Sequence, residues 1–279
     1  MAVVVITGCS SGFGMLTAVE FARRGDTVYA TMRNTAKADR LRAEAAAAGV
    51  SVEVPQLDVN DGGSVNAAIE EVIRHNGRID VLVNNAGVSA RGPIEDFDDD
   101  EILAIFEPNV FGVIRVTRAV LPYMRSQGSG TIVTVSSFAG RVPTPFSGIY
   151  SASKHAVEAL SDALYYELHP FGIRVVLIEP GEFETQVFDN LLLARRFTDG
   201  SAYLAAGRRF AEVRDKLAGP GRRGDPQIVA DAIVDAAKAD QPKRRYLIGR
   251  DVEVIAGMHK TMSDEEFEKA IRTMLDWWD

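Results

Sequence analysis

Short apolar runs rich in β-branched residues alternate with longer amphipathic stretches along most of this sequence. The runs cover residues 3–6, 27–31, 51–57, 80–83, 130–136, 173–179 and 245–248. The amphipathic stretches lie at about 12–24, 35–48, 62–76, 99–126, 150–169 and 226–239. Strands that are joined by helical crossovers form a parallel sheet with helices on both faces. We therefore predict an α/β protein, a doubly wound parallel sheet of about seven strands in one domain, residues 1–279.

Charge and cysteine content argue against several classes of function. The chain has 31 Lys and Arg against 39 Asp and Glu, a net charge of -8 that opposes binding to nucleic acid or anionic lipid. Cys9 is the only cysteine, so neither an intramolecular disulfide nor a Cys-rich zinc site can form. The sequence has no apolar run of about 18 residues and no basic leader. We expect a cytoplasmic protein with no membrane span, no metal and no nucleic-acid partner.

A glycine-rich turn, T-G-C-S-S-G-F-G at residues 7–14, follows the first predicted strand. Glycines let a ligand approach the backbone closely, and the N–H groups that open the next helix attract a pyrophosphate. The spacing is G-x-x-x-G-x-G, which differs from the common G-x-G-x-x-G. A plain turn without a ligand is the alternative, but the position after the first strand favours a dinucleotide. The candidate contacts in this turn are Gly8, Ser10, Ser11, Gly12, Phe13 and Gly14.

Further motifs follow the third, fourth and sixth predicted strands. Together with the glycine turn they resemble, in type and order, the landmarks of the single-domain short-chain dehydrogenase/reductase family. The resemblance covers residues 2–185 well and 226–250 loosely, and it implies a Rossmann-type fold that binds a nicotinamide dinucleotide. Its further cofactor-binding candidates are Asp58, Val59, Asn84, Asn85, Ala86, Gly87, Pro180, Gly181 and Thr185. Each of these motifs could also be a cap or a turn at the end of a strand.

The end of the second predicted strand bears on the choice of cofactor. In a dinucleotide fold this end meets the adenosine ribose, where a carboxylate binds a free 2′-hydroxyl and a guanidinium accepts a 2′-phosphate. NAD users of the family tend to carry Asp at the position of Met32, and Arg33 follows it. Arg can bind a phosphate bidentately, so we infer NADP(H). NAD(H) remains the alternative, because Arg33 could be a solvated charge and the glycine turn carries Ser11 instead of a basic residue.

Tyr150 and Lys154 are four residues apart, so their side chains share one face if this stretch is helical. A nearby ammonium favours the ionised form of a phenol. Tyr150 could then exchange a proton with a substrate oxygen while a hydride moves to or from the nicotinamide. By resemblance both side chains also contact the cofactor. A Y-x-x-x-K pair alone is a weak signal, because it also arises on solvated helix faces.

Ser137 and Asn109 complete the set of catalytic candidates. Ser137 follows an apolar strand at the edge where ligands bind in such sheets, and it lies thirteen residues before Tyr150, as in the family. Its hydroxyl would stabilise charge on the substrate oxygen. Ser136 is its rival, and the family spacing selects Ser137. By resemblance Asn109 interrupts its helix and holds a water that links Lys154 to solvent. Pro108 departs from the family pattern and would bend the helix at the same place.

The glycine turn, the second strand end and the Y-S-A-S-K segment at 150–154 are most similar to the 17β-hydroxysteroid and retinol dehydrogenase branch. We expect a substrate lid at about 182–225 and a C-terminal amphipathic helix at about 263–278. The family usually pairs through its long helices, so a homodimer or homotetramer is expected. The leading interpretation is an NADP(H)-dependent oxidoreductase that interconverts an alcohol and its carbonyl on a hydrophobic substrate. The alternatives are a non-catalytic NADP sensor or scaffold, and a sugar-nucleotide epimerase, which the glycine spacing disfavours.

Overall fold

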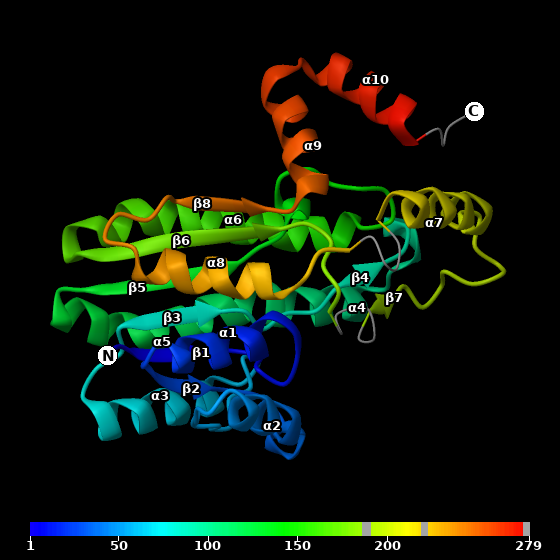
Figure 1. Ribbon diagram of the computed structural model, residues 1–279. Coiled ribbons are helices and arrows are strands. Elements are labelled where there is room, and N and C mark those ends of the chain that lie inside the picture. The colour runs from blue at the N-terminus through cyan, green and yellow to red at the C-terminus, as the bar shows by residue number, and fades with distance from the viewer. Residues whose placement is uncertain (186–190, 219–222, 276–279) are drawn as a thin grey trace.

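A six-stranded parallel sheet forms the centre of the computed structural model, which describes residues 1–185, 191–218 and 223–275 (Figure 1). Its strand order is β2-β1-β3-β5-β6-β8. β2 lies on one side of β1, and β3 with all later strands of this sheet lies on the other side. The strands are β1 (Val3–Ile6), β2 (Thr27–Ala30), β3 (Val81–Asn84), β5 (Gly130–Val135), β6 (Ile173–Pro180) and β8 (Arg245–Ile248). A separate pair joins β4 (Ala90–Arg91) to β7 (Leu192–Leu193). This architecture confirms the predicted Rossmann-like α/β class.

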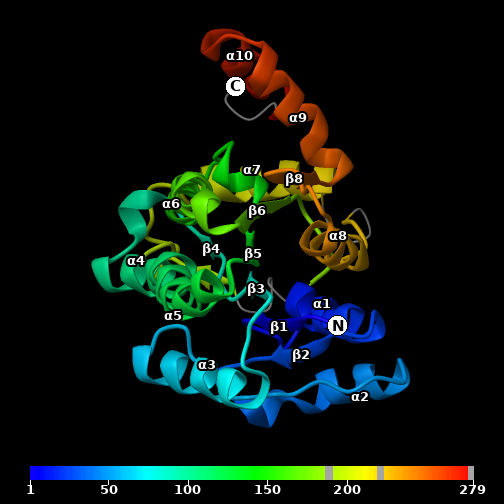
Figure 2. The same ribbon diagram turned by 90° about the vertical axis from the view of Figure 1, so that its left-hand side faces the viewer.

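Helices cover both faces of the sheet (Figure 2). Successive side chains of a strand point to opposite faces. In β1, Val4 and Ile6 therefore pack with α1 and α8, whereas Val3 and Val5 pack with α3 and α5. All four β1 residues are buried, which explains the continuous apolar run. The helices are α1 (Gly12–Arg23), α2 (Asp39–Ala47), α3 (Gly62–Asn76), α4 (Asp99–Phe106), α5 (Gly112–Gln127), α6 (Gly148–Leu168), α7 (Leu204–Ala218), α8 (Gln227–Lys238), α9 (Arg250–Thr261) and α10 (Asp264–Leu275).

The prediction of a regular strand at 51–57 is wrong. This segment runs beside β2 but pairs with it only through isolated bridges, Tyr29 to Glu53 and Met32 to Gln56. Pro55 lies between the two bridges and has no N–H to donate to a ladder. The main sheet therefore has six strands in the described part of the chain, not about seven.

The predicted helix at 99–126 is broken in the middle. A π-helical turn, Glu107–Phe111, separates α4 from α5. Pro108 lies in this turn, where its ring cannot donate a helix hydrogen bond. The expected interruption at Asn109 is thus present in the backbone.

The last two helices project from the edge of the body beyond β8 (Figures 1 and 2). A capping box at Ser263 starts the predicted C-terminal amphipathic helix: Ser263 N donates to Glu266 Oε2 at 2.9 Å, and Glu266 N donates to Ser263 Oγ at 3.3 Å. The helix α10 ends at Leu275, and residues 276–278 of the prediction lie outside the described residues. No helix in the described ranges has the length and apolarity to cross a membrane.

Candidate functional site

A large cavity of about 1480 Å³ lies at the carboxyl ends of the parallel strands. It exceeds the roughly 300–1,000 Å³ typical of a pocket for one small ligand, so it has room for two ligands side by side. The predicted residues that line it are Gly8, Ser10, Ser11, Gly12, Phe13, Arg33, Asp58, Val59, Asn85, Ala86, Gly87, Ser137, Tyr150, Lys154, Pro180, Gly181 and Thr185. Segments that are distant in sequence therefore meet in one site.

The glycine turn is built for close backbone contact. Gly8 has a φ of 75°, and a Cβ atom on it would lie 2.8 Å from the Cα atom of Ala86. Thr7 fixes the opposite segment, because its Oγ1 accepts hydrogen bonds from the backbone N atoms of Asn85 and Ala86, each at 3.0 Å. The N-terminal residues of α1, Gly12 and Phe13, line the cavity. This positive end of a helix can receive a phosphate, so the turn fits a dinucleotide.

Two candidate cofactor contacts, Asn84 and Gly14, do not line the cavity. The buried Asn84 side chain points to α5 and donates from Nδ2 to Thr117 Oγ1 at 3.0 Å. A Cβ atom on Gly14 would lie 2.4 Å from Asn85 Nδ2 and 2.6 Å from Gly8 O. Gly14 thus packs against Asn85 and Gly8, and Asn84 against α5, while a cofactor contact of either residue stays a prediction. The sequence could not show this, because it does not state the direction of a side chain at the end of a strand.

The end of the cavity next to β2 is basic. Arg33 is exposed on its wall, and Lys37 from the 3-10 turn Thr35–Lys37 lines it as well. Lys37 is not among the predicted residues, although a second cation four residues after Arg33 is visible in the sequence. Asp58 uses one carboxylate oxygen locally, since Oδ1 accepts a bond from Asn60 N at 3.0 Å.

Ser137, Tyr150 and Lys154 come together on the cavity wall. Ser137 directly precedes the turn Phe138–Gly140, and its Oγ accepts a hydrogen bond from Ala139 N at 3.1 Å. Tyr150 and Lys154 lie on α6, with Lys154 Nζ 5.9 Å from the centre of the Tyr150 ring. Nζ donates to Val135 O at 3.0 Å, so the end of β5 holds the lysine. A side-chain hydrogen bond joins Tyr150 to Ser137.

Burial governs the protonation of this site. It raises the pKa of Tyr150 above its ordinary value, although the hydrogen bond with Ser137 acts in the opposite direction. Burial also lowers the pKa of Lys154 to about 8, while the negative charge of Glu158 opposes that effect. Burial and the Ser137 hydrogen bond are the two effects on the pKa of the phenol here, and an acidifying effect of the lysine stays a prediction.

Asn109 is buried next to the site and does not line the cavity. Its Nδ2 donates to Ser153 Oγ at 3.0 Å, and Ser153 Oγ donates to Tyr150 O at 2.7 Å. A Cβ atom on Gly87 would lie 2.9 Å from Asn109 Oδ1 and 3.9 Å from Lys154 Nζ. Asn109 thus connects the π-helical turn to the backbone of α6 beneath Tyr150. The Asn109 side chain therefore supports this wall of the cavity.

The turn after β6 closes the cavity opposite the glycine turn. Gly181 N donates to Ile248 O at 2.8 Å, which attaches this turn to β8. A Cβ atom on Gly12 would lie 3.6 Å from Thr185 Cβ, so Thr185 faces the start of α1. Among the remaining lid residues, Val187 and Phe188 lie outside the described residues.

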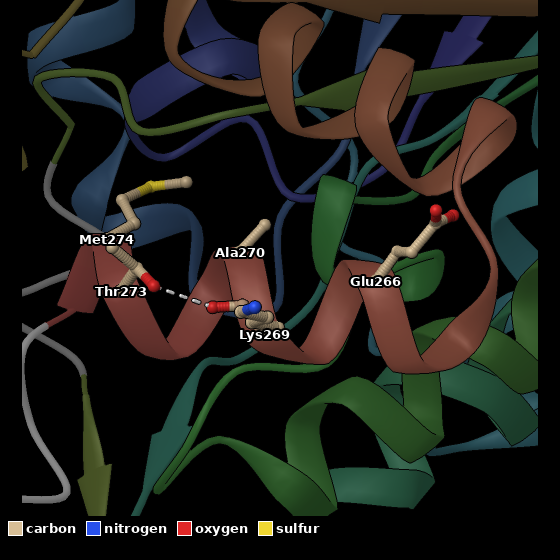
Figure 3. A pocket seen from close by; sticks show the side chains of 5 residues that line it. All are labelled: Glu266, Lys269, Ala270, Thr273 and Met274. Atoms are coloured by element: carbon tan, nitrogen blue, oxygen red, sulfur yellow. Dashed lines mark hydrogen bonds between the residues drawn. The ribbon is translucent and has the colours of Figure 1, made fainter.

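A second, smaller hollow of about 490 Å³ lies against α10 (Figure 3). Its five lining residues all come from this helix, and Thr273 Oγ1 donates to Lys269 O within it at 2.9 Å. Met274 lines both this hollow and the large cavity. The two hollows share this one residue, and the other four residues of the smaller hollow do not line the large cavity. No group of three or more metal-ligating side chains occurs in the described part of the chain.

Comparison with known proteins shows the family. Residues 2–195 match the model of the short chain dehydrogenase family. The chain belongs to the short-chain dehydrogenases. This short-chain dehydrogenase is 34% identical over 271 residues to 3-ketodihydrosphingosine reductase of Bacteroides thetaiotaomicron, covering 97% of the chain and 96% of the relative. It is 37% identical over 253 residues to human 17-beta-hydroxysteroid dehydrogenase type 1, covering 88% and 76%.

Solved structures of short-chain dehydrogenases have the same fold. A short-chain dehydrogenase from Streptomyces avermitilis superposes with a TM-score of 0.81 at 36% identity, over 98% of both chains. A gluconate 5-dehydrogenase from Burkholderia cenocepacia that holds NADP has a TM-score of 0.74 at 27% identity, over 91% of this chain and 95% of that one. A relative from Burkholderia phymatum that holds NAD has a TM-score of 0.78 at 29% identity, over 96% and 95%. The neighbours thus bind either nicotinamide cofactor.

Proposed function

We propose that this short-chain dehydrogenase interconverts a primary or secondary alcohol and its carbonyl on a hydrophobic substrate, with NADP(H) as cofactor. The observation that carries the proposal is the meeting of Ser137, Tyr150 and Lys154 with the glycine turn in one cavity. A binding protein would need a nucleotide cradle but no buried proton donor beside it. For this reason an enzyme accounts for the site better than a sensor or scaffold does.

The preference for NADP(H) over NAD(H) follows from the charges at the adenosine end. Arg33 and Lys37 line the cavity there, and the position where a carboxylate would select NAD is the apolar Met32. A guanidinium can bind a 2′-phosphate with two parallel hydrogen bonds. Asp58 and Val59 would border the adenine, and the turn of Pro180 and Gly181 with Thr185 would hold the carboxamide end.

Each catalytic residue has a separate task in this proposal. A bound nicotinamide cofactor supplies or accepts the hydride. Tyr150 donates its phenolic proton to the carbonyl oxygen during reduction, which suits its raised pKa, and takes a proton from the alcohol during oxidation. Ser137 donates a hydrogen bond to the same oxygen and stabilises its developing charge. Lys154 stabilises the phenolate that remains, and Asn109 keeps the path from Lys154 towards solvent in place.

The proposed substrate is hydrophobic because much of the cavity lining is apolar. Leu192, Phe210, Ile255, Ile271 and Leu275 line the cavity from the segment 182–225 and from α9 and α10, and the lining also contains the charged Arg91, Asp100 and Arg214. Burial of a long alkyl chain or a fused ring system against such a wall is favourable. The names of the two relatives, a ketodihydrosphingosine reductase and a hydroxysteroid dehydrogenase, agree with a bulky apolar carbonyl compound.

We extend the proposal to organisation and location. The chain acts as one catalytic domain with its lid and C-terminal helix, and it forms a homodimer or homotetramer through α5 and α6, as the family usually does. The single, buried Cys9 suits a reducing compartment such as the cytoplasm.

The test is a turnover panel with NADPH and NADH against ketones and aldehydes of increasing apolar size, followed by loss of absorbance of the reduced cofactor. We expect turnover with NADPH to increase from small ketones to long-chain or polycyclic ones. Tight NADPH binding without turnover on any carbonyl compound would instead indicate the non-catalytic sensor.

A further inference from the structure

Two carboxylates are buried behind the catalytic lysine, on the side away from the cavity. Glu158 lies one helical turn after Lys154 on α6 and is 7% exposed. Glu179, near the end of β6 and directly before Pro180, is 0% exposed. Both face Arg245, the first residue of β8: its Nη2 is 3.2 Å from Glu158 Oε2, and its Nε is 3.0 Å from Glu179 Oε1.

This cluster also touches the loop that carries Ser137. Arg141, just after the loop, places Nη1 3.4 Å from Glu179 Oε2. Gly140 is wedged against the cluster, since a Cβ atom on it would lie 3.1 Å from Glu158 Cγ and 2.9 Å from Ser136 Oγ. The charged groups packed around Glu158 are Lys154 and Asp162 on its own helix, Glu179 on β6, Arg245 on β8, and behind these Arg141 and Arg244.

Charges that are taken out of water persist only when they are paired or hydrogen-bonded. Here two buried carboxylates share the guanidinium of Arg245, and Glu179 also faces Arg141. Glu158 lies one helical turn from the buried ammonium of Lys154. The hydrogen bond of Lys154 Nζ goes to the neutral Val135 carbonyl, so Glu158 acts on this ammonium through space, without a direct bond among the described residues. Glu158 raises the pKa of Lys154 against the effect of burial, and burial with the neighbouring Glu179 raises the pKa of Glu158 itself while Arg245 opposes this.

We propose that Glu158, held in place by Arg245, is a positioning residue that keeps Lys154 charged beneath Tyr150. The inference rests on the proposed function and adds a residue to it. Glu158 acts through Lys154 and touches neither substrate nor cofactor. The cluster also links the Ser137 loop, α6 and the end of β6, because Arg245 pairs with both carboxylates and Arg141 pairs with Glu179.

The test compares Glu158→Gln, which removes the charge at nearly constant shape, with Glu158→Asp, which keeps the charge. Glu167→Gln is the matched control, because Glu167 is an exposed carboxylate on the same helix. The readout is the titration of the Lys154 ammonium in the ligand-free protein, followed by NMR with labelled lysine and assigned with a Lys154→Met variant. A second readout is the alkaline limb of kcat/KM for ketone reduction.

In the wild-type protein we expect Lys154 to titrate at about 8. Glu158→Gln should lower this value by about one pH unit and move the alkaline limb in the same direction, because an opposite charge at short range shifts a pKa by about that much or more. Glu158→Asp keeps the charge, so the pKa of Lys154 in this variant should stay close to the wild-type value. If the Glu158→Gln variant does not fold, the Lys154 titration of Glu158→Asp is the measurement that tests the inference. Glu167→Gln should leave both readouts unchanged.

An unchanged Lys154 titration in Glu158→Gln would overturn the inference, even if that variant lost stability. Failure of the proposed function looks different. A wild-type protein that turns over no carbonyl compound would refute the enzyme, whereas the titration needs neither cofactor nor substrate and still decides the role of Glu158.

Discussion

Asn109 pairs with the backbone of Val88 through both ends of its side-chain amide. Oδ1 accepts from Val88 N at 2.8 Å, and Nδ2 donates to Val88 O at 2.9 Å. The amide thereby acts as a strand neighbour for the segment that leaves β3 and lines the cavity. This pairing explains why an asparagine occupies the π-helical turn.

Asn109→Ala should destabilise the protein by about 1–3 kcal/mol, because it leaves the two backbone groups of Val88 without their partner. We expect a lower kcat as well, since Gly87 and the wall beside Lys154 lose their support. Urea denaturation and steady-state kinetics measure the two effects. Asn66→Ala, at an exposed site on α3, should change neither. Equal stability of both variants would show that the Val88 pairing contributes nothing.

Tyr150→Phe should reduce kcat by a factor on the order of 10²–10⁴, because it removes the proton donor and leaves the shape of the cavity intact. NADPH affinity, measured by fluorescence titration, should remain close to that of the wild type. Tyr166→Phe is the control, since Tyr166 lies on the same helix and is 68% exposed. Near-wild-type turnover of Tyr150→Phe would refute its role as acid and base.

Arg33→Asp should shift cofactor preference from NADPH towards NADH by about 10- to 100-fold in the ratio of kcat/KM values. A charged hydrogen bond of about 1.5–3 kcal/mol is lost, and repulsion of the 2′-phosphate is added. The exposed Arg40, which does not line the cavity, provides the control Arg40→Asp. If both variants keep the wild-type ratio, Arg33 does not read the phosphate.

Gly14→Ala and Gly257→Ala place the same methyl group on two helices with opposite surroundings. At Gly14 the new Cβ atom would lie 2.4 Å from Asn85 Nδ2, whereas at Gly257 it would meet nothing within 4 Å. The first variant should lose stability and NADPH affinity, because the glycine turn must shift. The second should gain about 0.5–1 kcal/mol from helix propensity. Thermal denaturation of the pair checks this, and a stable, tightly binding Gly14→Ala would contradict the crowding.

Ile271→Asp should lower kcat/KM for long-chain ketones by about tenfold or more, and it should leave small ketones nearly unaffected. The substitution puts a charge on an apolar part of the cavity lining, where an alkyl chain would bury its surface. Glu265→Gln, at an exposed site on the same helix, is the control. An equal loss on both substrate sizes would mean that α10 supports the fold without touching substrate.

Much of the site was predictable because parallel strands bring their carboxyl ends to one edge. Motifs that follow β1, β3, β5 and β6 must then meet, whatever the lengths of the helices between them. The family motifs supplied the order and the spacing of Ser137 and Tyr150. The pattern did not show which way a side chain at a strand end turns, as at Asn84, and it was wrong where a single proline removes a ladder donor, as at Pro55.

By itself the sequence determined the alternation of strands and helices, the glycine turn and the family, and it predicted the catalytic residues, since these depend on local patterns and on motifs in order. Only the tertiary structure decided that burial outweighs the Ser137 hydrogen bond in its effect on the pKa of Tyr150, and that Glu158, Glu179 and Arg245 form one cluster. Desolvation and ion pairing depend on what surrounds a group in space. Residues 158, 179 and 245 lie on different elements, and their contact exists only once the sheet has formed.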